Sequence, residues 1–314
     1  MHIGNYLGSI KKWVDLQEKE EDLFFFIADL HAITTPYNPA ELQEKIFQTE
    51  AIYLAAGLDP QKCVLFVQSQ IKEHTELAWY LETITPVGEL RRMTQFKEKA
   101  KKHPDYVNSG LLNYPVLMAS DIFLYKAEKV PVGLDQLQHL ELARTIARKF
   151  NRMFGKTFPE PQPLLSEEGD KIASLQEPTK KMSKTDNEKS YISLYDTPES
   201  IKKKIMAAVT DTGKEIKYNP KKKPGISNLL VIYSKFSGKT ISEIEEKFKG
   251  AKYVDFKKAL ANLLIEKLEP IRRKRENLLK RPSFIKEILE EGRKRAQKIA
   301  SSTIEEVKMK MGLL

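Results

Sequence analysis

The chain has 314 residues, which is enough for two domains and a sizeable hydrophobic core. Its hydrophobic fraction is 41%, and no apolar run approaches the roughly 18 residues that a membrane span needs, so we expect a soluble cytoplasmic protein. The single cysteine, Cys63, excludes an internal disulfide and a multi-cysteine zinc site. The five histidines have no metal-ligand spacing either, and no metal site is predicted.

The net charge of +10 is unevenly distributed along the chain. Residues 1–186 carry 23 Lys and Arg against 26 Asp and Glu, whereas residues 187–314 carry 30 against 17. Clustered cations gain free energy by neutralising phosphates, so the basic part predicts an anionic polymer as partner. A solvated, lysine-rich helical surface is the alternative explanation.

The first half of the chain alternates strand-like and helix-like segments. The apolar run at 23–27 predicts a buried strand, and the periodic segment between Pro39 and Gly57 predicts a helix. CVLFVQSQ at 63–70 predicts the next strand, and HTELAWYLETI at 74–84 the next helix. This order predicts an α/β fold with a Rossmann-like, doubly wound parallel sheet. Ligands bind at the carboxyl ends of such strands, where four polar side chains fall: Asp29, His31, Gln68 and Ser69.

The chain is predicted to be mostly helical after residue 186. Helices are expected at 197–210, 225–238, 240–250, 253–280 and 283–312, with Thr197 as an N-cap and with Pro270 and Pro282 as interruptions. We therefore expect an α/β domain at 1–186 and a helical, basic domain at 187–314, with the end of the chain able to pack back on the first domain.

The motif HIGN occupies residues 2–5. Gly4 lets the backbone approach a flat or anionic ligand closely, and the following segment presents a helix N-terminus to phosphate. His2 and Asn5 can donate hydrogen bonds to phosphate oxygens. A chance histidine near a chain terminus is the alternative explanation.

A second motif, KKMSKTD, occupies residues 180–186. Lys181, Ser183 and Lys184 alternate around Met182 in a loop that can fold over a triphosphate and offer two cations to a departing pyrophosphate. A solvated lysine run explains Lys180 and Lys181 equally well.

The stretch GLLNYPVLMASDIF at 110–123 predicts a helix with Pro115 in its first turn. Residues three and four positions apart share a helix face, so Tyr114, Met118 and Asp121 are expected on one side.

The stretch VPVGLDQLQHL at 130–140 precedes an amphipathic helix. Gly133 permits a close approach to a ligand, and Asp135 and Gln136 supply polar contacts. The alternative is an ordinary helix with Asp135 as its N-cap.

Together, HIGN and KMSKT resemble the paired motifs of class I aminoacyl-tRNA synthetases, and the internal stretches resemble the tryptophanyl/tyrosyl subclass. Tyrosyl members typically have Tyr-x3-Gln-x2-Asp on this helix, whereas the middle residue here is Met118. A polarizable Met suits an indole face, and Asp121 can accept from the indole N–H. Further segments match the bacterial tryptophanyl pattern in order: DLHAIT, GELRRMTQFKEKA, PTKKMSKTD, AVTDTG and KPGISNLL.

The resemblance implies roles for individual residues. It implies an ATP site made of His2, Gly4, Asn5, Gly133, Leu134, Asp135, Ile172, Lys181, Met182, Ser183, Lys184 and Thr185. It implies a tryptophan site in which Tyr114 and Gln136 hold the ammonium, Asp121 holds the indole nitrogen, and His31, Met118, Val130 and Val132 line the ring pocket. The implied catalytic residues are His2, Asn5, Lys99, Lys181 and Lys184, with Lys99 at the ATP phosphates. Core packing is the alternative for the two valines.

The implied activity is that of a tryptophan–tRNA ligase, which activates tryptophan with ATP and transfers it to tRNA(Trp). Magnesium is expected on the ATP phosphates with water ligands and without a protein cage. Residues 1–186 would be the catalytic domain and 187–314 the anticodon-binding domain of a homodimer. Candidates for reading the anticodon are Arg272, Arg273, Arg275, Tyr253 and Phe256.

Three alternatives stay open: a tyrosyl-tRNA synthetase, a non-catalytic RNA-binding protein of the same fold, and a nucleotidyltransferase acting on a small carboxylate. Members of the subclass carry a first buried strand before the HIGN motif, whereas here Met1 precedes His2 directly. We therefore expect this strand to be lacking, through a misplaced start rather than a natural deletion, with impaired stability and activation if the chain truly begins at Met1.

Overall fold

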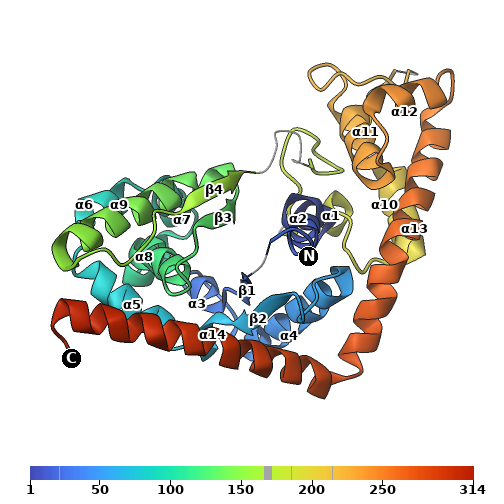
Figure 1. Cartoon of the computed structure of the whole chain (residues 1–314). Helices are drawn as coiled ribbons and strands as arrows, with labels where there is room; N and C mark the ends of the chain where they lie inside the picture. Colours follow the sequence, from blue (N-terminus) through green and yellow to red (C-terminus); the bar gives the residue numbers. More distant parts are fainter. Residues whose placement is uncertain (21, 166–171, 185, 214) are drawn as a thin grey trace. The chain divides into compact units, whose positions relative to one another are not determined.

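The computed structural model describes residues 1–20, 22–165, 172–184, 186–213 and 215–314, and the chain divides into two compact units (Figure 1). Unit 1 comprises Met1–Lys19, Ala51–Leu58 and Glu167–Pro282, and unit 2 comprises Glu20–Glu50, Asp59–Ser166 and Ser283–Leu314. These bounds differ from a division at residue 186. The two functional domains stay a prediction.

The strands of the described residues lie in unit 2, and their pairings are parallel. β1 (Leu23–Ile27) pairs with β2 (Cys63–Val67), and β3 (Lys129–Val132) pairs with β4 (Gln162–Leu165). The predictions of strands at 23–27 and from residue 63 are confirmed. We expected one continuous sheet, but no described strand joins the two pairs, because β1 bonds only to β2 and β3 only to β4.

Helices precede and follow these strands in unit 2, as an α/β arrangement requires. They are α3 (Asp29–Ala32), α4 (Pro39–Ala56, from Ala51 onward in unit 1), α5 (Glu73–Glu82), α6 (Val87–Arg92), α7 (Thr94–Lys102), α8 (Ser109–Phe123), α9 (Leu137–Phe154) and α14 (Pro282–Met311).

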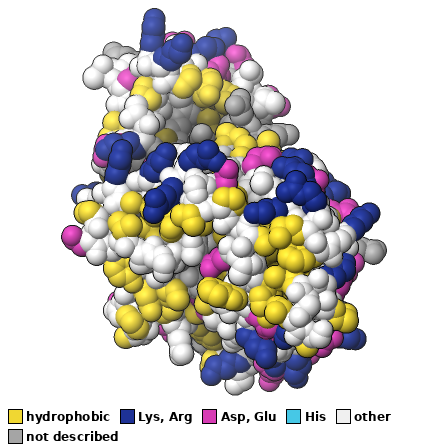
Figure 2. All heavy atoms as spheres, turned by 90° about the vertical axis from the view of Figure 1, so that its left-hand side faces the viewer, with side chains coloured by type: hydrophobic (Ala, Val, Ile, Leu, Met, Phe, Trp, Pro, Cys, Tyr) yellow, Lys and Arg dark blue, Asp and Glu magenta, His cyan; other side chains and the backbone are white. Residues whose placement is uncertain are grey.

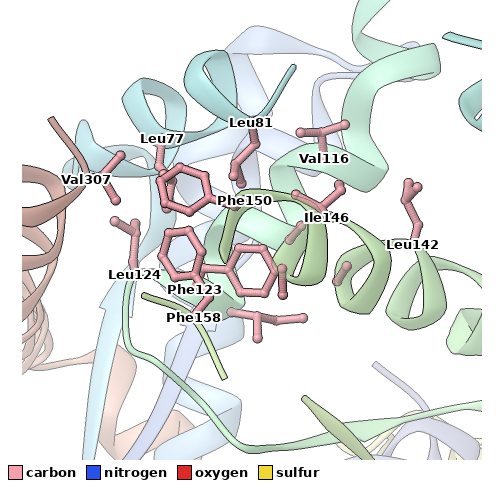
Figure 3. Close-up of a cluster of buried hydrophobic side chains, with 14 of the residues drawn as sticks. Leu77, Leu81, Val116, Phe123, Leu124, Leu142, Ile146, Phe150, Phe158 and Val307 are labelled. Carbon is pink, nitrogen blue, oxygen red and sulfur yellow. The ribbon is translucent and has the colours of Figure 1, made fainter. Parts of the chain in front are cut away.

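The core of unit 2 is rich in aromatic rings. Phe123 of α8 stacks on Phe158 with ring centroids 4.6 Å apart, and Phe150 of α9 lies 4.8 Å from Phe158 (Figure 3). Leu77 and Leu81 of α5 are fully buried in the same cluster. Burying each large apolar side chain stabilises the fold by roughly 1.5–3 kcal/mol. This packing fixes α8, the helix that carries the predicted tryptophan-binding face.

The last helix, α14, packs within unit 2. A Cβ at Gly292 would lie 1.8 Å from the carbonyl oxygen of Leu65, so only glycine lets α14 approach β2 this closely. Thr303 Oγ1 donates to the carbonyl of Leu124 at 2.8 Å, and Val307 is fully buried in the core (Figure 3). The C-terminal helix is therefore part of the α/β core.

Unit 1 is helical in its described residues. Its α-helices are α1 (Ile3–Asn5), α2 (Lys11–Leu16), α10 (Pro198–Ala207), α11 (Pro224–Ser237), α12 (Ile241–Lys247) and α13 (Tyr253–Leu279), and a π-helical segment at Tyr6–Ile10 joins α1 to α2. Thr197 caps α10 as predicted, because its Oγ1 accepts from the N–H of Ser200 at 3.2 Å. The predicted interruption at Pro270 was wrong: Pro270 lies inside α13, where the buried side chains of Leu268 and Ile271 hold the helix on both sides of it.

In the part of the chain that the structure describes, none of the helices combines the length and the apolar composition that crossing a membrane requires.

Candidate active site

The HIGN motif forms a compact turn in unit 1. His2 Nδ1 accepts from the N–H of Gly4 at 3.1 Å, and Asn5 Oδ1 accepts from the N–H of His2 at 3.1 Å. The turn is tied to a later segment, because Ile3 N–H donates to the Ile192 carbonyl at 2.9 Å and His2 forms an antiparallel bridge with Ser193. With these acceptors engaged, the Nε2–H of His2 and the amide N–H groups of Asn5 are the donors that can serve a phosphate.

The KMSKT motif follows a short hairpin in the same unit. Ala173 and Lys181 form an antiparallel bridge, and Met182 N–H donates to the Ile172 carbonyl at 3.0 Å. Ile172 and Met182 are buried, whereas Lys181 and Lys184 are exposed. The apolar side chains thus anchor the segment and leave the two cations accessible. Thr185, predicted for the ATP site, lies outside the described residues.

Asn228 of α11 holds this hairpin in place. Its Oδ1 accepts from the N–H of Ala173 at 2.9 Å, and its Nδ2 donates to the carbonyl of the same residue at 3.0 Å. Sequence reasoning missed this role. The available signal in the sequence was a polar Asn next to the apolar residues at the start of a predicted helix, and the structure shows that this Asn is buried.

The two motifs also interact electrostatically. Burial, followed by the positive charges of the N-terminal amine, Lys181 and Lys184, lowers the pKa of His2 to about 4. His2 is therefore neutral at pH 7, and its ring has one N–H to donate. The structure brings together the residues predicted to act on the ATP phosphates from HIGN and KMSKT.

In unit 2, Asp121 is the centre of a buried hydrogen-bond network. Its Oδ1 accepts from Gln68 Nε2 at 2.7 Å and pairs with His74 Nδ1 at 2.6 Å, and its Oδ2 pairs with His31 Nε2 at 2.7 Å. Burial alone would raise the pKa of Asp121, but the hydrogen bonds from His31 and His74 outweigh burial and lower the pKa to about 2. Asp121 is thus a buried, ionised acceptor at neutral pH.

His74 connects Asp121 to Tyr125 through hydrogen bonds at both of its ring nitrogens. His74 is fully buried, and its Nε2 lies 2.9 Å from the hydroxyl of Tyr125. Gln68, which donates to Asp121, also accepts from the N–H of Leu30 at 3.2 Å. Sequence analysis placed Gln68 at a strand end but gave no role to His74 or Tyr125, because neither belongs to a recognisable motif.

Tyr114 and Gln136, the residues predicted for the ammonium, are brought together by His139. Tyr114 Oη lies 3.1 Å from His139 Nε2, and His139 Nδ1 lies 2.8 Å from Gln136 Oε1. Lys99 Nζ sits 4.3 Å from the centre of the Tyr114 ring, and burial lowers the pKa of Lys99. The His31 ring lies edge-on to Tyr114 at 6.1 Å, which connects this group to Asp121.

The remaining predicted residues of unit 2 lie near this group in the sequence. Leu134–Gln136 form a 3₁₀ turn, and Gln136 precedes α9 without a side-chain cap, so the alternative of Asp135 as helix N-cap is not observed. A Cβ on Gly133 would lie 2.6 Å from Asp135 Oδ1. Val132 belongs to the hydrophobic core and Val130 packs against it, as the core-packing alternative expects.

The position predicted for Pro115 was wrong. α8 begins at Ser109, because Asn108 caps it by accepting from the N–H of Leu111 at 2.9 Å, so Pro115 lies inside the helix. Met118, one turn after Tyr114, is half-buried and packs against the core.

Comparison with known proteins identifies the family. The model described as tRNA synthetases class I (W and Y) matches residues 1–269. The chain is 50% identical over 315 residues to the tryptophan–tRNA ligase of Caldanaerobacter subterraneus, covering 100% of this chain and 95% of the relative. The chain belongs to this family of class I tRNA synthetases.

Solved structures agree with this assignment. The tryptophanyl-tRNA synthetase of Mycoplasma pneumoniae has a TM-score of 0.88 and 37% identity, covering 99% of this chain and 94% of the other. The enzyme of Campylobacter jejuni, complexed with ADP and tryptophan, has a TM-score of 0.86 and 37% identity, covering 99% and 96%. The predictions of a Rossmann-like α/β fold and of a class I synthetase resembling the bacterial tryptophanyl enzymes are confirmed.

The buried His139 makes the stability of this synthetase depend on pH. Burial, with Lys99 nearby, lowers the pKa of His139 from 6.5 to about 4. Between these values the unfolded chain binds a proton that the folded chain does not, so stability falls as pH decreases through this window. Between pH 7 and pH 5, the melting temperature of the wild type should therefore fall further than that of His139→Gln. We expect the two drops, measured in circular dichroism melts, to differ by on the order of 5 °C.

The matched control is His103→Gln, which removes a histidine from the same unit outside the network. It should keep the wild-type pH dependence. Identical pH dependence in wild type and His139→Gln would contradict the prediction.

Proposed function

We propose that this class I synthetase is a cytoplasmic tryptophan–tRNA ligase. The observation that carries the proposal is Asp121, a buried and ionised acceptor on the helix face of Tyr114 and Met118. An indole ring needs an apolar pocket with one acceptor, because its N–H only donates. The tryptophan–tRNA ligases that share 46–50% identity with this chain support the same substrate.

Tryptophan binds through its indole N–H, its ammonium group and its ring. Asp121 accepts from the indole N–H, while Tyr114 and Gln136 accept from the ammonium. His31 and Met118 border the ring. Tyrosine lacks a donor in the position of the indole N–H, so it does not form the hydrogen bond to Asp121 that tryptophan forms and is bound less tightly.

In unit 1, ATP binds through the HIGN and KMSKT segments. His2 and Asn5 donate to phosphate oxygens, and Lys181 and Lys184 supply positive charge. The buried Ile172 and Met182 anchor the segment that includes Ser183. Magnesium enters as part of the ATP substrate and is held by phosphate oxygens and water.

Activation needs no covalent nucleophile from the protein. A carboxylate oxygen of tryptophan attacks the α-phosphorus, the bond from the α-phosphorus to the bridging oxygen breaks, and pyrophosphate leaves with that oxygen. Negative charge grows on the leaving group, where Lys181 and Lys184 stabilise it more in the transition state than in bound ATP. The terminal ribose hydroxyl of tRNA(Trp) then attacks the acyl carbon and AMP departs.

The tRNA is proposed to bind the basic part of the chain after residue 187, where Lys and Arg number 30 against 17 Asp and Glu. Two of the predicted anticodon-reading residues are excluded by burial. Phe256 is fully buried and stacks on Tyr233 at 5.7 Å, and Arg275 is 9% exposed with its guanidinium 4.4 Å from the ring centre of Tyr195. Base reading would therefore fall to exposed side chains of these helices.

A homodimer is proposed through an apolar groove of unit 2. The groove encloses about 370 Å³ between α3, α5 and α8, and its lining includes Leu30, Ile33, Ala78, Trp79, Tyr114 and Leu117. Trp79 is 65% exposed, which is costly for a large aromatic side chain without a partner. Apolar side chains also gather in patches among Lys and Arg on the face shown in Figure 2.

Replacing Trp79 with glutamate should weaken this dimer at least about 30-fold, because exposed tryptophans are frequent binding hot spots. Light scattering at micromolar concentration should show a monomer for Trp79→Glu and a dimer for the wild type. Met309→Glu, which changes another exposed apolar side chain, should leave the dimer intact. A wild-type monomer, or a dimeric Trp79→Glu, would refute the proposed interface.

The test of the function is exchange of labelled pyrophosphate into ATP. Dependence on tryptophan is the expected result. Dependence on tyrosine would make the protein a tyrosyl-tRNA synthetase, and the absence of exchange with any amino acid would favour a non-catalytic RNA-binding protein.

A further inference from the structure

We propose that His139 is a positioning residue that fixes Tyr114 and Gln136 as hydrogen-bond acceptors for the substrate ammonium. The inference rests on the proposed tryptophan site and adds a residue that has no motif of its own. His139 touches neither the ring pocket predicted from sequence nor the ATP motifs. Its ring is 1% exposed and bridges the two ammonium ligands.

The polarity of the network can be followed from one end to the other. Asp135 Oδ2 lies 3.2 Å from Gln136 Nε2, and a carboxylate only accepts, so the amide nitrogen of Gln136 faces Asp135. Gln136 Oε1 therefore faces His139, and Nδ1 of the imidazole must carry the proton in that 2.8 Å contact.

The direction of the hydrogen bond between Tyr114 and His139 follows from the charge of His139. Burial keeps the imidazole neutral at pH 7, since its pKa is lowered to about 4. A neutral ring with its proton on Nδ1 offers a lone pair at Nε2, so the hydroxyl of Tyr114 must donate to it across 3.1 Å.

Both ammonium ligands are left with lone pairs and without a competing proton. Tyr114 Oη has given its only proton to His139, and Gln136 Oε1 retains one free acceptor site. An ammonium group has three donors and no acceptor, so this arrangement matches it. Without His139, the Tyr114 hydroxyl can rotate its proton toward the substrate and the Gln136 amide can flip.

The experiment compares two ligands that differ in the ammonium alone. Calorimetry measures binding of L-tryptophan and of indole-3-propionate, which has the ring and the carboxylate but no ammonium. Hydrogen bonds to a charged group are worth a factor of about 10 to 100 in affinity, so His139→Phe should weaken tryptophan binding by that factor. The same variant should weaken the binding of indole-3-propionate by less than about threefold.

Two conservative variants separate this role from simple packing. The amide of Gln reaches roughly the place of Nε2 and that of Asn the place of Nδ1, so His139→Gln keeps a partner for Tyr114 and His139→Asn keeps one for Gln136. Each should retain tryptophan affinity between that of the wild type and His139→Phe. His103→Asn in the same unit should bind both ligands as the wild type does.

Equal weakening of both ligands in all three His139 variants would show a structural role and overturn the inference, as would unchanged tryptophan binding in His139→Phe. If the wild type itself neither binds tryptophan nor exchanges pyrophosphate, the proposed function fails and the inference fails with it. A functional wild type with equal losses refutes the inference alone.

Discussion

Asp121→Ala is expected to raise the KM for tryptophan about 100-fold in pyrophosphate exchange, because a buried site built around one hydrogen bond discriminates strongly when that bond is lost. The KM for ATP should stay within about twofold, since Asp121 contacts none of the residues assigned to ATP. Steady-state kinetics with each substrate varied in turn measures both values. A larger effect on kcat than on tryptophan KM would contradict the assigned role.

The same substitution should also reduce stability. Removing the carboxylate leaves Gln68, His74 and His31 without their shared acceptor, and two of these side chains are fully buried. An unsatisfied buried donor costs about 1–3 kcal/mol. Asp105→Asn is the matched control, because it alters an exposed carboxylate of the same unit. It should change neither KM nor the melting temperature.

Much of the fold follows from local patterns in the sequence. The strands at 23–27 and 63–67, and helices such as α4, α5 and α10, form where periodicity and capping residues predict them. The errors arose where tertiary packing overrides local chemistry. Pro115 was predicted in the first turn of a helix and Pro270 as an interruption of one. Both lie inside helices, where neighbouring side chains are buried.

The site shows the same division between local and long-range information. The motifs predicted the residues that would contact the substrates, because binding of ATP and tryptophan requires particular residue types at particular spacings. The supporting residues His74, Asn228 and His139 were not predicted. His74 contacts Asp121, 47 positions away, and Asn228 contacts Ala173, 55 positions away. No local pattern encodes such a pairing. His139 contacts Gln136 three positions before it, but its contact with Tyr114 spans 25 positions. The substrate-touching roles themselves stay predictions until they are measured.

The second large effect is expected at the KMSKT lysines. Lys184→Ala should lower kcat for pyrophosphate exchange about 100-fold, because a positive charge placed where the leaving pyrophosphate gains charge stabilises mainly the transition state. Tryptophan affinity, measured by calorimetry without ATP, should stay within about twofold. Lys184 is exposed, so the substitution should leave the melting temperature unchanged.

The motif supplies its own control in Lys180. This lysine stands four positions before Lys184, is equally exposed, and forms an ion pair with Glu177. If positive charge in this loop acted only by attracting ATP from solution, Lys180→Ala and Lys184→Ala would raise the KM for ATP alike. If Lys184 meets the leaving group, only Lys184→Ala lowers kcat and Lys180→Ala stays within about twofold of the wild type. Comparable losses of kcat in both variants would show that loop charge, and not the position of Lys184, governs activation.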